Sequence, residues 1–272
     1  MDKTWLTVPA PAKLNLMLHI TGRRPDGYHE LQTIFQFLDF GDELSYKIRT
    51  DDQLTLEPEI TGVKFEDNLI IKAARSLQKH PRAKDKTLGA DIKLTKILPM
   101  GGGLGGGSSN AATTLLALNQ LWQCHLDLDQ LASLGLDLGA DVPIFVFGKS
   151  AFAQGIGEEL TQVEPDTPHY LLLKPDCEVK TVQIFNDKCL TRDTPPIKIP
   201  HALKLGGHND CLEVVRKHNP EENEAYLWLK NQGDAKLTGT GSCLFAAFDS
   251  RDDVLNVLAQ VPKRWQAWHC QG

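Results

Sequence analysis

The chain has 272 residues, of which 41% are hydrophobic and 24% charged, and its formal net charge is −6. This length is enough to bury a substantial core in one large or two modest domains. Basic residues form no run longer than pairs such as Arg23-Arg24 and Lys263-Arg264, which excludes the positive patch typical of nucleic-acid and anionic-membrane binders. We therefore expect neither a nucleic-acid nor a membrane partner.

The cysteines and the N-terminal residues indicate a reducing compartment. Six cysteines are scattered without a CxxC or other metal-ligand spacing, which predicts free thiols. The stretch from Met1 to Trp5 lacks the apolar core of a signal peptide. No apolar run approaches the roughly 18 to 20 residues that span a bilayer. The sequence thus predicts a soluble, cytoplasmic protein.

The first segment with a clear pattern is Ala12 to Leu16, where apolar and polar residues alternate as in a strand. Lys13 and Asn15 then share one face of that strand, about 7 Å apart. A solvated strand face explains this pattern as well as a functional face does, because exposed lysine is common. The pattern alone leaves both interpretations open.

A turn follows this strand. Pro25-Asp-Gly27 is an explicit turn signal within a loop from Thr21 to Glu30. Tyr28 and His29 come directly after it and could supply a stacking ring and a hydrogen-bonding imidazole. A pair that merely anchors the turn is the more frequent case.

The stretch from residue 31 to 95 is typical of a scaffold. Runs rich in β-branched and aromatic residues predict strands. An apolar helical pattern from Leu69 to Leu77 follows a cap at Asp67 or Asn68, and the polar stretch from Lys79 to Lys86 predicts a surface loop. The predicted strands are Leu31 to Phe40, Glu43 to Ile48, Gln53 to Leu56 and Ala90 to Thr95.

The most informative stretch is Pro99-Met-Gly-Gly-Gly-Leu-Gly-Gly-Gly-Ser-Ser-Asn-Ala-Ala112, which we call the glycine segment. Its glycines let the backbone adopt positive φ and approach a ligand closely. Ser108, Ser109 and Asn110 offer side-chain oxygens to cap the helix predicted to begin there. The free N–H groups of that helix N-terminus would face the glycines, so the segment predicts a phosphate-binding site.

Asp141 is a second candidate, in the stretch Gly139-Ala-Asp-Val-Pro143 that follows a short helix capped near Asp127. An ordinary turn aspartate is the plain alternative. The apolar run from Ile144 to Phe147 predicts a buried strand, with the Asp141 carboxylate at its edge. A carboxylate in such a place needs a partner, and Lys13 is our candidate.

The second half of the chain alternates strands and helices, which predicts an α+β arrangement. Near its centre lies a second glycine loop, Leu237-Thr-Gly-Thr-Gly-Ser-Cys243. It is either a tight turn or a second surface for the same ligand. The expected elements are the strands Tyr170 to Lys174 and Cys243 to Phe248 and the helices Asp210 to Lys217, Asn223 to Asn231 and Asp252 to Gln260.

The familiar phosphate-binding patterns do not fit the glycine segment. A Walker A loop needs Gly-Lys-Ser/Thr, whereas Gly107 is followed by two serines. Residues 101–106 satisfy G-x-G-x-x-G formally, but Asp127, about 20 positions further on, opens a helix and does not end a second parallel strand. Protein-kinase motifs are absent from the sequence.

The motifs together resemble the superfamily of galactokinase, homoserine kinase, mevalonate kinase and phosphomevalonate kinase. The glycine segment is similar to its second motif, and the loop from Leu237 to Cys243 is similar to its third. Three further stretches resemble the 4-diphosphocytidyl-2-C-methyl-D-erythritol kinase branch: Pro11-Ala-Lys-Leu-Asn-Leu16, Arg24-Pro-Asp-Gly-Tyr-His29 and Gly139-Ala-Asp-Val-Pro143.

The resemblance implies an α+β, two-domain small-molecule kinase fold with the active site in the interdomain cleft. We expect residues 1–155 to form the ATP-binding and catalytic domain and residues 156–272 the substrate-side domain. The implied activity is ATP-dependent phosphorylation of the 2-hydroxyl of the cytidine-diphosphate-linked methylerythritol, in the non-mevalonate isoprenoid route. ATP and Mg²⁺ are the implied cofactors.

The resemblance also carries residue roles. It implies that Lys13 and Asp141 are catalytic, with Asp141 accepting the hydroxyl proton and Lys13 holding it ionised and oriented. Ser109 is the candidate metal ligand. The implied ATP-binding residues are Asn68, Lys96, Pro99, Met100, Gly101, Gly102, Gly103, Leu104, Gly105, Gly106, Gly107, Ser108 and Ser109. The implied substrate-binding residues are Asn15, Tyr28, His29, Phe185, Thr240 and Gly241.

Two other classes of function compete with this interpretation. Another small-molecule kinase of the superfamily would keep the glycine segment but lack the Pro-Asp-Gly-Tyr-His turn. A non-catalytic ligand sensor would not need both Lys13 and Asp141. ATP turnover that depends on the cytidyl substrate separates the three possibilities.

Overall fold

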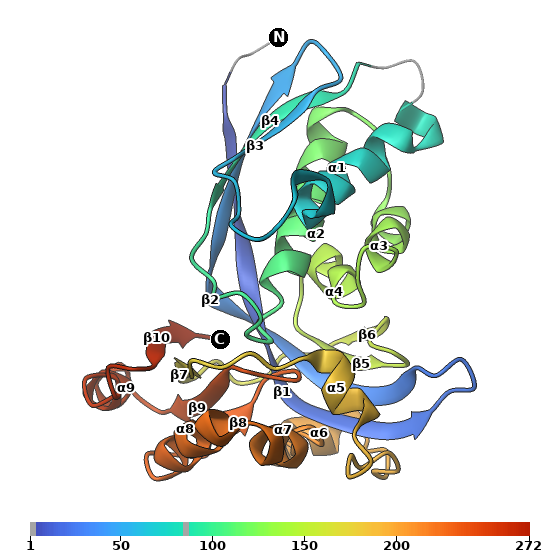
Figure 1. Cartoon of the computed structure of the whole chain (residues 1–272). Helices are drawn as coiled ribbons and strands as arrows, with labels where there is room; N and C mark the ends of the chain where they lie inside the picture. Colours follow the sequence, from blue (N-terminus) through green and yellow to red (C-terminus); the bar gives the residue numbers. More distant parts are fainter. Residues whose placement is uncertain (1–3, 84–86) are drawn as a thin grey trace. The chain divides into compact units, whose positions relative to one another are not determined.

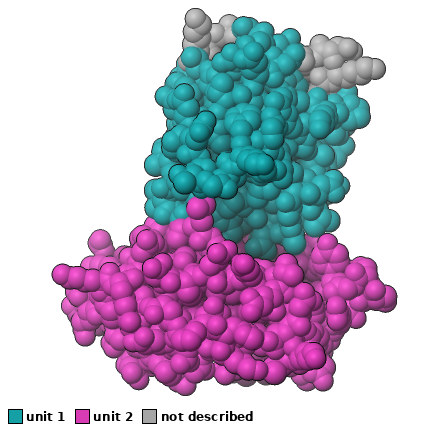
Figure 2. All heavy atoms as spheres, viewed as in Figure 1, with its two compact units in different colours: residues 1–12, 41–98, 105–148 teal, residues 13–40, 99–104, 149–272 magenta. Residues whose placement is uncertain are grey.

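The computed structural model describes residues 4–83 and 87–272 of this α+β protein (Figure 1). The chain divides into two compact units, coloured separately in Figure 2. Unit 1 comprises residues 1–12, 41–98 and 105–148, and unit 2 comprises residues 13–40, 99–104 and 149–272. The sequence predicts instead two consecutive domains. The units are interleaved because the long strands β1 (Leu6–Arg23) and β2 (His29–Arg49) each contribute residues to both.

The strand β2 is continuous where the sequence predicts two strands, Leu31 to Phe40 and Glu43 to Ile48. Gly41 lies between them, and a Cβ on Gly41 would stand 2.4 Å from the carbonyl oxygen of Ala10 on β1. The prediction of two strands was wrong because this glycine permits a close approach of the two backbones and does not form a turn.

In unit 1 the second half of β2 pairs antiparallel with β4 (Gly89–Thr95), and β3 (Leu54–Glu57) pairs parallel with β4. Alternation along the strands buries Tyr46 and Ile92 completely or nearly so. The Tyr46 hydroxyl lies 2.9 Å from the Thr114 hydroxyl, which joins the sheet to a helix behind it. The predicted strands over Gln53 to Leu56 and Ala90 to Thr95 are thus confirmed within a residue or two.

Helices cover this sheet in unit 1 (Figure 1). Two of them begin at the predicted caps: the Asn68 Oδ1 accepts a hydrogen bond from the Ile70 N–H at 2.9 Å, and Asp127 forms a capping box with Gln130. The helices are α1 (Leu69–Lys79), α2 (Gly106–Leu121), α3 (Leu128–Leu136) and α4 (Val142–Phe147), with short 3-10 turns η1 (Phe65–Asp67) and η2 (Pro81–Ala83). The end of the predicted loop, residues 84–86, lies outside the described residues.

The apolar run before Gly148 is a helix, α4, and not the buried strand that the sequence predicts. Pro143 occupies the first turn, where its missing N–H costs nothing, and Gly148 ends the helix with φ 70°. The residues from Val142 to Val146 are buried on every side. An apolar run without periodicity does not distinguish a buried strand from a short buried helix, which explains the wrong prediction.

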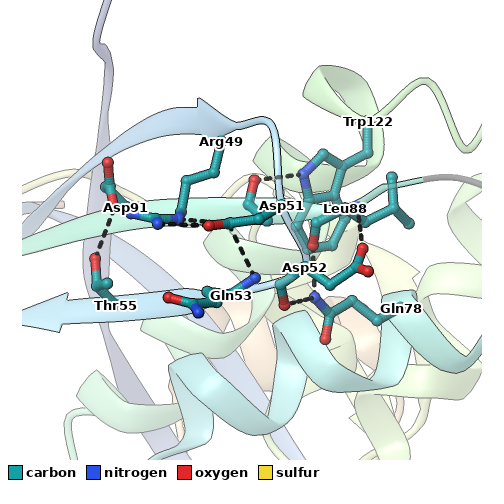
Figure 3. Close-up of polar contacts among 10 residues, drawn as sticks. Arg49, Asp51, Asp52, Gln53, Thr55, Gln78, Leu88, Asp91 and Trp122 are labelled. Carbon is teal, nitrogen blue, oxygen red and sulfur yellow. Dashed lines mark hydrogen bonds and ion pairs between the residues drawn. The ribbon is translucent and has the colours of Figure 1, made fainter.

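Polar contacts join the loops at the far end of this sheet to α1 (Figure 3). Arg49 donates Nε and Nη2 to the Asp51 carboxylate, both at 2.7 Å, and Nη1 to Asp91 Oδ1 at 2.6 Å. Gln78 of α1 donates to the Leu88 carbonyl at 2.5 Å. The bidentate hydrogen bond from Arg49 lowers the pKa of Asp51 to about 2.

In unit 2 the first half of β2 pairs antiparallel with β5, and β5 pairs with β6. A second sheet has the order β10-β7-β9-β8, and its buried leucines form a core with the helices packed on it. The strands are β5 (Ala151–Gln154), β6 (Glu159–Gln162), β7 (His169–Lys174), β8 (Lys236–Leu237), β9 (Leu244–Phe248) and β10 (Gln266–Gln271). The helices are α5 (Thr181–Asn186), α6 (Ile199–Leu205), α7 (Leu212–His218), α8 (Pro220–Lys230) and α9 (Arg251–Leu258).

Two further observations bear on the sequence predictions. All six cysteines lie within the described residues and are free thiols. Across residues 4–83 and 87–272, every helix is too short or too polar to cross a membrane.

Candidate active site

The glycine segment enters α2 through a glycine cap and not through a serine or asparagine cap. Gly105 is the N-cap residue, with φ 74° in the left-handed region that favours glycine. Ser108, Ser109 and Asn110 therefore lie inside the helix, which corrects their predicted role as caps. The first intrahelical bond at this end runs from the Ser109 N–H to the Gly105 carbonyl, so the preceding N–H groups point out of the helix end.

Ser109 is fully buried in this helix, and its hydroxyl has no hydrogen-bond partner among the described residues. Buried hydroxyls in folded proteins are rarely left without a hydrogen-bond partner. A bound group at this point would supply the partner that the Ser109 hydroxyl lacks. The side chain carbonyl of the adjacent Asn110 likewise lacks a partner within the described chain.

Asp42 organises the entry to α2, and sequence reasoning missed it. Its carboxylate is buried and accepts hydrogen bonds from the Ile97 N–H at 2.7 Å, the Leu98 N–H at 2.8 Å and the Asn110 side chain at 3.0 Å. The Lys96 ammonium lies 2.8 Å from the same carboxylate. Asp42 therefore fixes both the segment before Pro99 and the first turn of α2. Its partners lie more than 50 positions away in the chain, so no local motif reveals it.

The first part of the glycine segment pairs with the second glycine loop, both in unit 2. The Ser242 N–H donates to the Gly101 carbonyl at 3.2 Å, and the Cys243 N–H donates to the Gly102 carbonyl at 3.1 Å. A Cβ on Gly103 would stand 2.3 Å from the Thr238 carbonyl oxygen. The two loops thus lie backbone against backbone, which only glycine permits.

Lys13 and Asn15 lie against these loops. Both side chains are buried, so the alternative of a solvated strand face was wrong. The Lys13 ammonium donates to Asn15 Oδ1 at 2.5 Å and to the Gly103 carbonyl at 2.9 Å, and it lies 5.4 Å from the ring centre of Phe35. A buried ammonium is costly unless it is hydrogen-bonded, so these contacts define where the charge sits.

Asp141 lies in unit 1, directly before α4, and its side chain is half-buried. Its backbone is helical, with φ −85° and ψ −7°. The carboxylate is thus at the start of a helix and not at the edge of a strand. Lys13 belongs to unit 2, and the pairing of the two residues stays a prediction.

His29 and Phe185 form an aromatic pair in unit 2. Their rings stack with centres 5.1 Å apart and an interplanar angle of 27°. Arg192, which sequence reasoning missed, donates Nε to His29 Nε2 at 3.1 Å and Nη2 to the Phe185 carbonyl at 2.9 Å. Tyr28, one residue before His29, is 60% exposed. Sequence separation hides Arg192, because it lies 163 positions from His29.

The surroundings of His29 disfavour the charged form of its imidazole. Burial lowers its pKa, and the positive charges of Arg192 and Arg23 lower it further. Because Arg192 donates to Nε2, the ring proton resides on Nδ1. The pair therefore presents a flat, uncharged surface beside a guanidinium.

The remaining predicted site residues lie in both units, and their roles stay predictions. Asn68 caps α1, Pro99 and Met100 begin the glycine segment with Met100 exposed, and the Thr240 hydroxyl lies 2.8 Å from that of Thr181. Gly241 is in the second glycine loop, with φ 89°.

Comparisons with known proteins extend these observations. Residues 68–149 match the family model described as GHMP kinases N terminal domain, and residues 198–267 match GHMP kinases C terminal. A 4-diphosphocytidyl-2-C-methyl-D-erythritol kinase of Marinomonas sp. (strain MWYL1) is 64% identical over 98% of this chain and 87% of its own length. The chain belongs to the GHMP kinases, within the 4-diphosphocytidyl-2-C-methyl-D-erythritol kinase family.

Other GHMP kinases support this assignment. A relative of the same name from Pseudomonas savastanoi pv. phaseolicola is 58% identical over all of this chain and 93% of its own length. A crystal structure of a 4-(cytidine 5'-diphospho)-2C-methyl-D-erythritol kinase aligns with a TM-score of 0.82 and 30% identity, over 98% of this chain and 100% of that one. The predicted two-domain α+β kinase fold is thereby confirmed. The chain is a small-molecule kinase, and its family uses ATP as phosphate donor.

Proposed function

We propose that this GHMP kinase transfers the γ-phosphoryl group of ATP to the 2-hydroxyl of 4-diphosphocytidyl-2-C-methyl-D-erythritol, a step of the non-mevalonate isoprenoid route. The observation that carries the proposal is the buried Lys13 ammonium, hydrogen-bonded to Asn15 and to the main chain of the glycine segment. A positive charge fixed on a phosphate-binding loop suits phosphoryl transfer, because the transition state is stabilised chiefly by positioning and charge neutralisation.

In this proposal Asp141 is the general base and accepts the proton of the substrate 2-hydroxyl. Lys13 orients Asp141 and neutralises charge on the transferring phosphoryl group. Asn15, which accepts from Lys13, is placed to contact the methylerythritol diol. Thr240 and Gly241 of the second glycine loop complete the acceptor side.

The N–H groups of the glycine segment and of the first turn of α2 would cradle the ATP phosphates, because a helix N-terminus favours anions. The ATP-binding residues are those expected from the sequence: Asn68, Lys96, Pro99, Met100, Gly101, Gly102, Gly103, Leu104, Gly105, Gly106, Gly107, Ser108 and Ser109. Lys96 already has an ordered ammonium, held by Asp42.

The residues of this site would bind magnesium with few protein ligands. The unpartnered Ser109 hydroxyl is the oxygen that would hold it, and no group of three or more His, Cys, Asp or Glu side chains in the described part of the chain forms a dedicated cage. Magnesium bound by substrate phosphates and one or two protein oxygens is common in kinases, where it neutralises phosphate charge.

The cytosine would bind between Tyr28 and the Phe185 ring, with the neutral His29 hydrogen-bonding to its edge. Stacking on an aromatic ring contributes about 1 to 3 kcal/mol per base. We place the ATP-binding and catalytic residues within residues 1–155, and residues 156–272 add Phe185, Thr240 and Gly241 on the substrate side. Free thiols throughout the chain support a reducing, cytoplasmic location.

Asp141→Asn tests the proposal. The amide cannot accept a proton, so kcat should fall roughly 10²- to 10⁴-fold while the fold stays intact. The measurement is ADP release that depends on the cytidyl substrate, with circular dichroism as the check on folding. Asp137→Asn, which removes an exposed carboxylate at the end of α3, is the matched control and should keep normal kcat.

Near-normal kcat in the Asp141→Asn variant would refute the base role. ADP release by the unaltered protein with mevalonate or homoserine, and none with the cytidyl substrate, would refute the acceptor. ATP binding without turnover of any acceptor would point to a sensor.

A further inference from the structure

The segment between α6 and α7 is fastened to the strand that carries Lys13. The Leu18 N–H donates to the His208 carbonyl, and the Asp210 N–H donates to the Leu18 carbonyl, both at 2.9 Å. The Asp210 carboxylate adds a bond of 2.6 Å from the Ile20 N–H. These contacts bracket Asn209, so its backbone is fixed on β1 within unit 2.

The Asn209 side chain uses both amide hydrogens and its carbonyl oxygen in hydrogen bonds. It is 8% exposed, and its amide donates to the Leu237 carbonyl and to the Gly239 carbonyl, each at 2.8 Å. Its Oδ1 accepts from the Cys211 N–H at 2.9 Å. The two donor bonds grip the second glycine loop on either side of Thr238.

Thr238 connects the second glycine loop to β1 through hydrogen bonds of its side chain. Its buried hydroxyl accepts from the Asn15 N–H at 3.0 Å and lies 3.2 Å from the Gly103 carbonyl and 3.4 Å from Asn15 Oδ1. These last two oxygens are the ones that accept from the Lys13 ammonium. These contacts form one hydrogen-bond network, which runs from β1 through Asn209 and Thr238 back to the residues that hold Lys13.

We propose that Asn209 is a positioning residue for phosphoryl transfer: by clamping the carbonyls that flank Thr238, it fixes the two oxygens that orient the Lys13 ammonium. The proposal rests on the proposed catalytic role of Lys13. Anchoring of the segment itself needs no Asn209 side chain, because His208 and Asp210 already bind it to β1. Both Asn209 amide hydrogens are donated to the second glycine loop. The geometry therefore supports a role of the Asn209 side chain in holding that loop.

Asn209→Ala should lower kcat roughly 10- to 100-fold, because a small misplacement of a catalytic group costs that much in rate. The KM values for ATP and for the cytidyl substrate should change less than twofold, since no substrate contact is removed. Asn219→Ala is the matched control. That residue also donates its side-chain amide to a backbone carbonyl, that of Val215, but it has no link to the loop, and its kcat should be unchanged.

Coupling to Thr238 and Lys13 separates positioning from general structural damage. Thr238→Val removes the hydroxyl and should lower kcat as Asn209→Ala does, whereas Thr238→Ser should restore it. The double variant Asn209→Ala/Thr238→Val should have a kcat no lower than that of either single variant, since both changes act through the same hydrogen-bond network. In a Lys13→Ala background, Asn209→Ala should cause no further loss.

Reductive methylation with formaldehyde, mapped by mass spectrometry, tests the positioning without any activity assay. Lys13 is 2% exposed and should react slowly in the natural chain, and several-fold faster after Asn209→Ala, while exposed lysines keep their rates. Unchanged Lys13 reactivity, additive losses in the double variant or a loss only in KM would each overturn the proposal. Faster methylation in a protein that does not turn over the cytidyl substrate would refute the proposed function and leave the positioning intact.

Discussion

His29 and Arg192 show how a single side chain acquires its chemistry from residues far away in the chain. Burial and two guanidinium groups lower the pKa of His29, and Arg192 also sets which ring nitrogen carries the proton. Arg192 binds the Leu190 carbonyl and the Asp187 carbonyl as well, at 3.1 Å and 2.7 Å, so it cannot move without the loop after α5. The imidazole is therefore a fixed hydrogen-bonding group whose charged form is disfavoured.

Tyr28→Ala should weaken binding of the cytidyl substrate and leave the fold intact. The ring is 60% exposed, so its removal should leave the stability of the fold nearly unchanged. The lost stacking should raise the KM for the cytidyl substrate roughly 5- to 150-fold, which corresponds to about 1 to 3 kcal/mol. The KM for ATP should stay constant.

Steady-state kinetics with each substrate varied in turn measures both constants. Leu205→Ala, which shortens another exposed side chain of the same unit, is the control and should change neither. Equal increases in both KM values after Tyr28→Ala would contradict a cytosine contact.

Among the secondary-structure elements, the two long strands contribute most to the fold, because each supplies residues to both units. β1 has 18 residues and β2 has 21, and they remain strands where polar residues and glycine interrupt the apolar pattern. Gly41 sits where the two backbones approach closely, and the Asp42 carboxylate directly after it accepts from the Ile97 and Leu98 N–H groups. The apolar pattern is thus interrupted at residues that make close backbone contacts or accept hydrogen bonds. A strand prediction based on periodicity treats such an interruption as the end of a strand.

Gly41→Ala should destabilise the fold. The added methyl group would stand 2.4 Å from the Ala10 carbonyl oxygen and 2.7 Å from the Pro11 Cα, so the backbones must move apart. We expect the free energy of unfolding to fall by about 1 to 3 kcal/mol, the usual cost of overpacking. Urea unfolding followed by circular dichroism measures it.

Gly22→Ala is the matched control on β1. A Cβ there meets the Glu30 Cβ at 3.7 Å, an ordinary contact. Its stability should be unchanged or higher by about 0.4 to 1 kcal/mol, because alanine restricts the unfolded chain. Equal stability of the Gly41→Ala protein and the natural chain would show that the strands yield at no cost.

At the scale of the whole molecule, one buried carboxyl group in unit 2 links the fold to pH. Glu222 of α8 is fully buried, its Oε2 accepts from the Cys177 thiol at 3.3 Å, and its Oε1 has no partner in the described residues. Burial raises the pKa of Glu222 to about 7, although the Cys177 hydrogen bond and the nearby charge of Lys174 oppose that shift. The folded chain therefore keeps Glu222 protonated over a range in which the unfolded chain ionises it.

The sign of the pH effect follows from this difference. An unfolded glutamate loses its proton near pH 4.5, whereas folded Glu222 loses it near pH 7. Its contribution to stability is therefore intact below pH 4.5, declines as the pH rises from 4.5 to 7 and levels off above 7. Over that interval the free energy of unfolding should fall by about 3 kcal/mol.

Glu222→Gln removes this titration and should gain stability relative to the natural chain between pH 5 and pH 8. Urea unfolding of both proteins at the two pH values measures the change. Any constant cost of the amide cancels, because only the difference between the pH values is compared. Glu213→Gln, on an exposed side chain, should show no such gain, and the same result for Glu222→Gln would contradict a raised pKa.

Much of the fold and of the candidate site can be predicted from the sequence where the information is local. Asn68 and Asp127 cap helices because their side chains reach N–H groups two or three residues away. The glycine segment leads into a helix, and most strands and helices fall near their expected positions. The prediction failed at α4, whose apolar run has no period, and no strand was predicted at β10, whose apolar and polar residues do not alternate regularly.

The kinase family, the order of the motifs and the local ends of the helices follow from the amino-acid sequence, since they depend on neighbouring residues. The three-dimensional structure was needed to show that Asp42 holds the entry to α2, that Arg192 binds His29 and that Asn209 and Thr238 contact the loops that hold Lys13. Asn15 and Thr238 are separated by 223 positions, and Asp42 and Asn110 by 68. Hydrogen bonds over such separations leave no periodic trace in a single sequence, because their geometry exists only once the strands have paired.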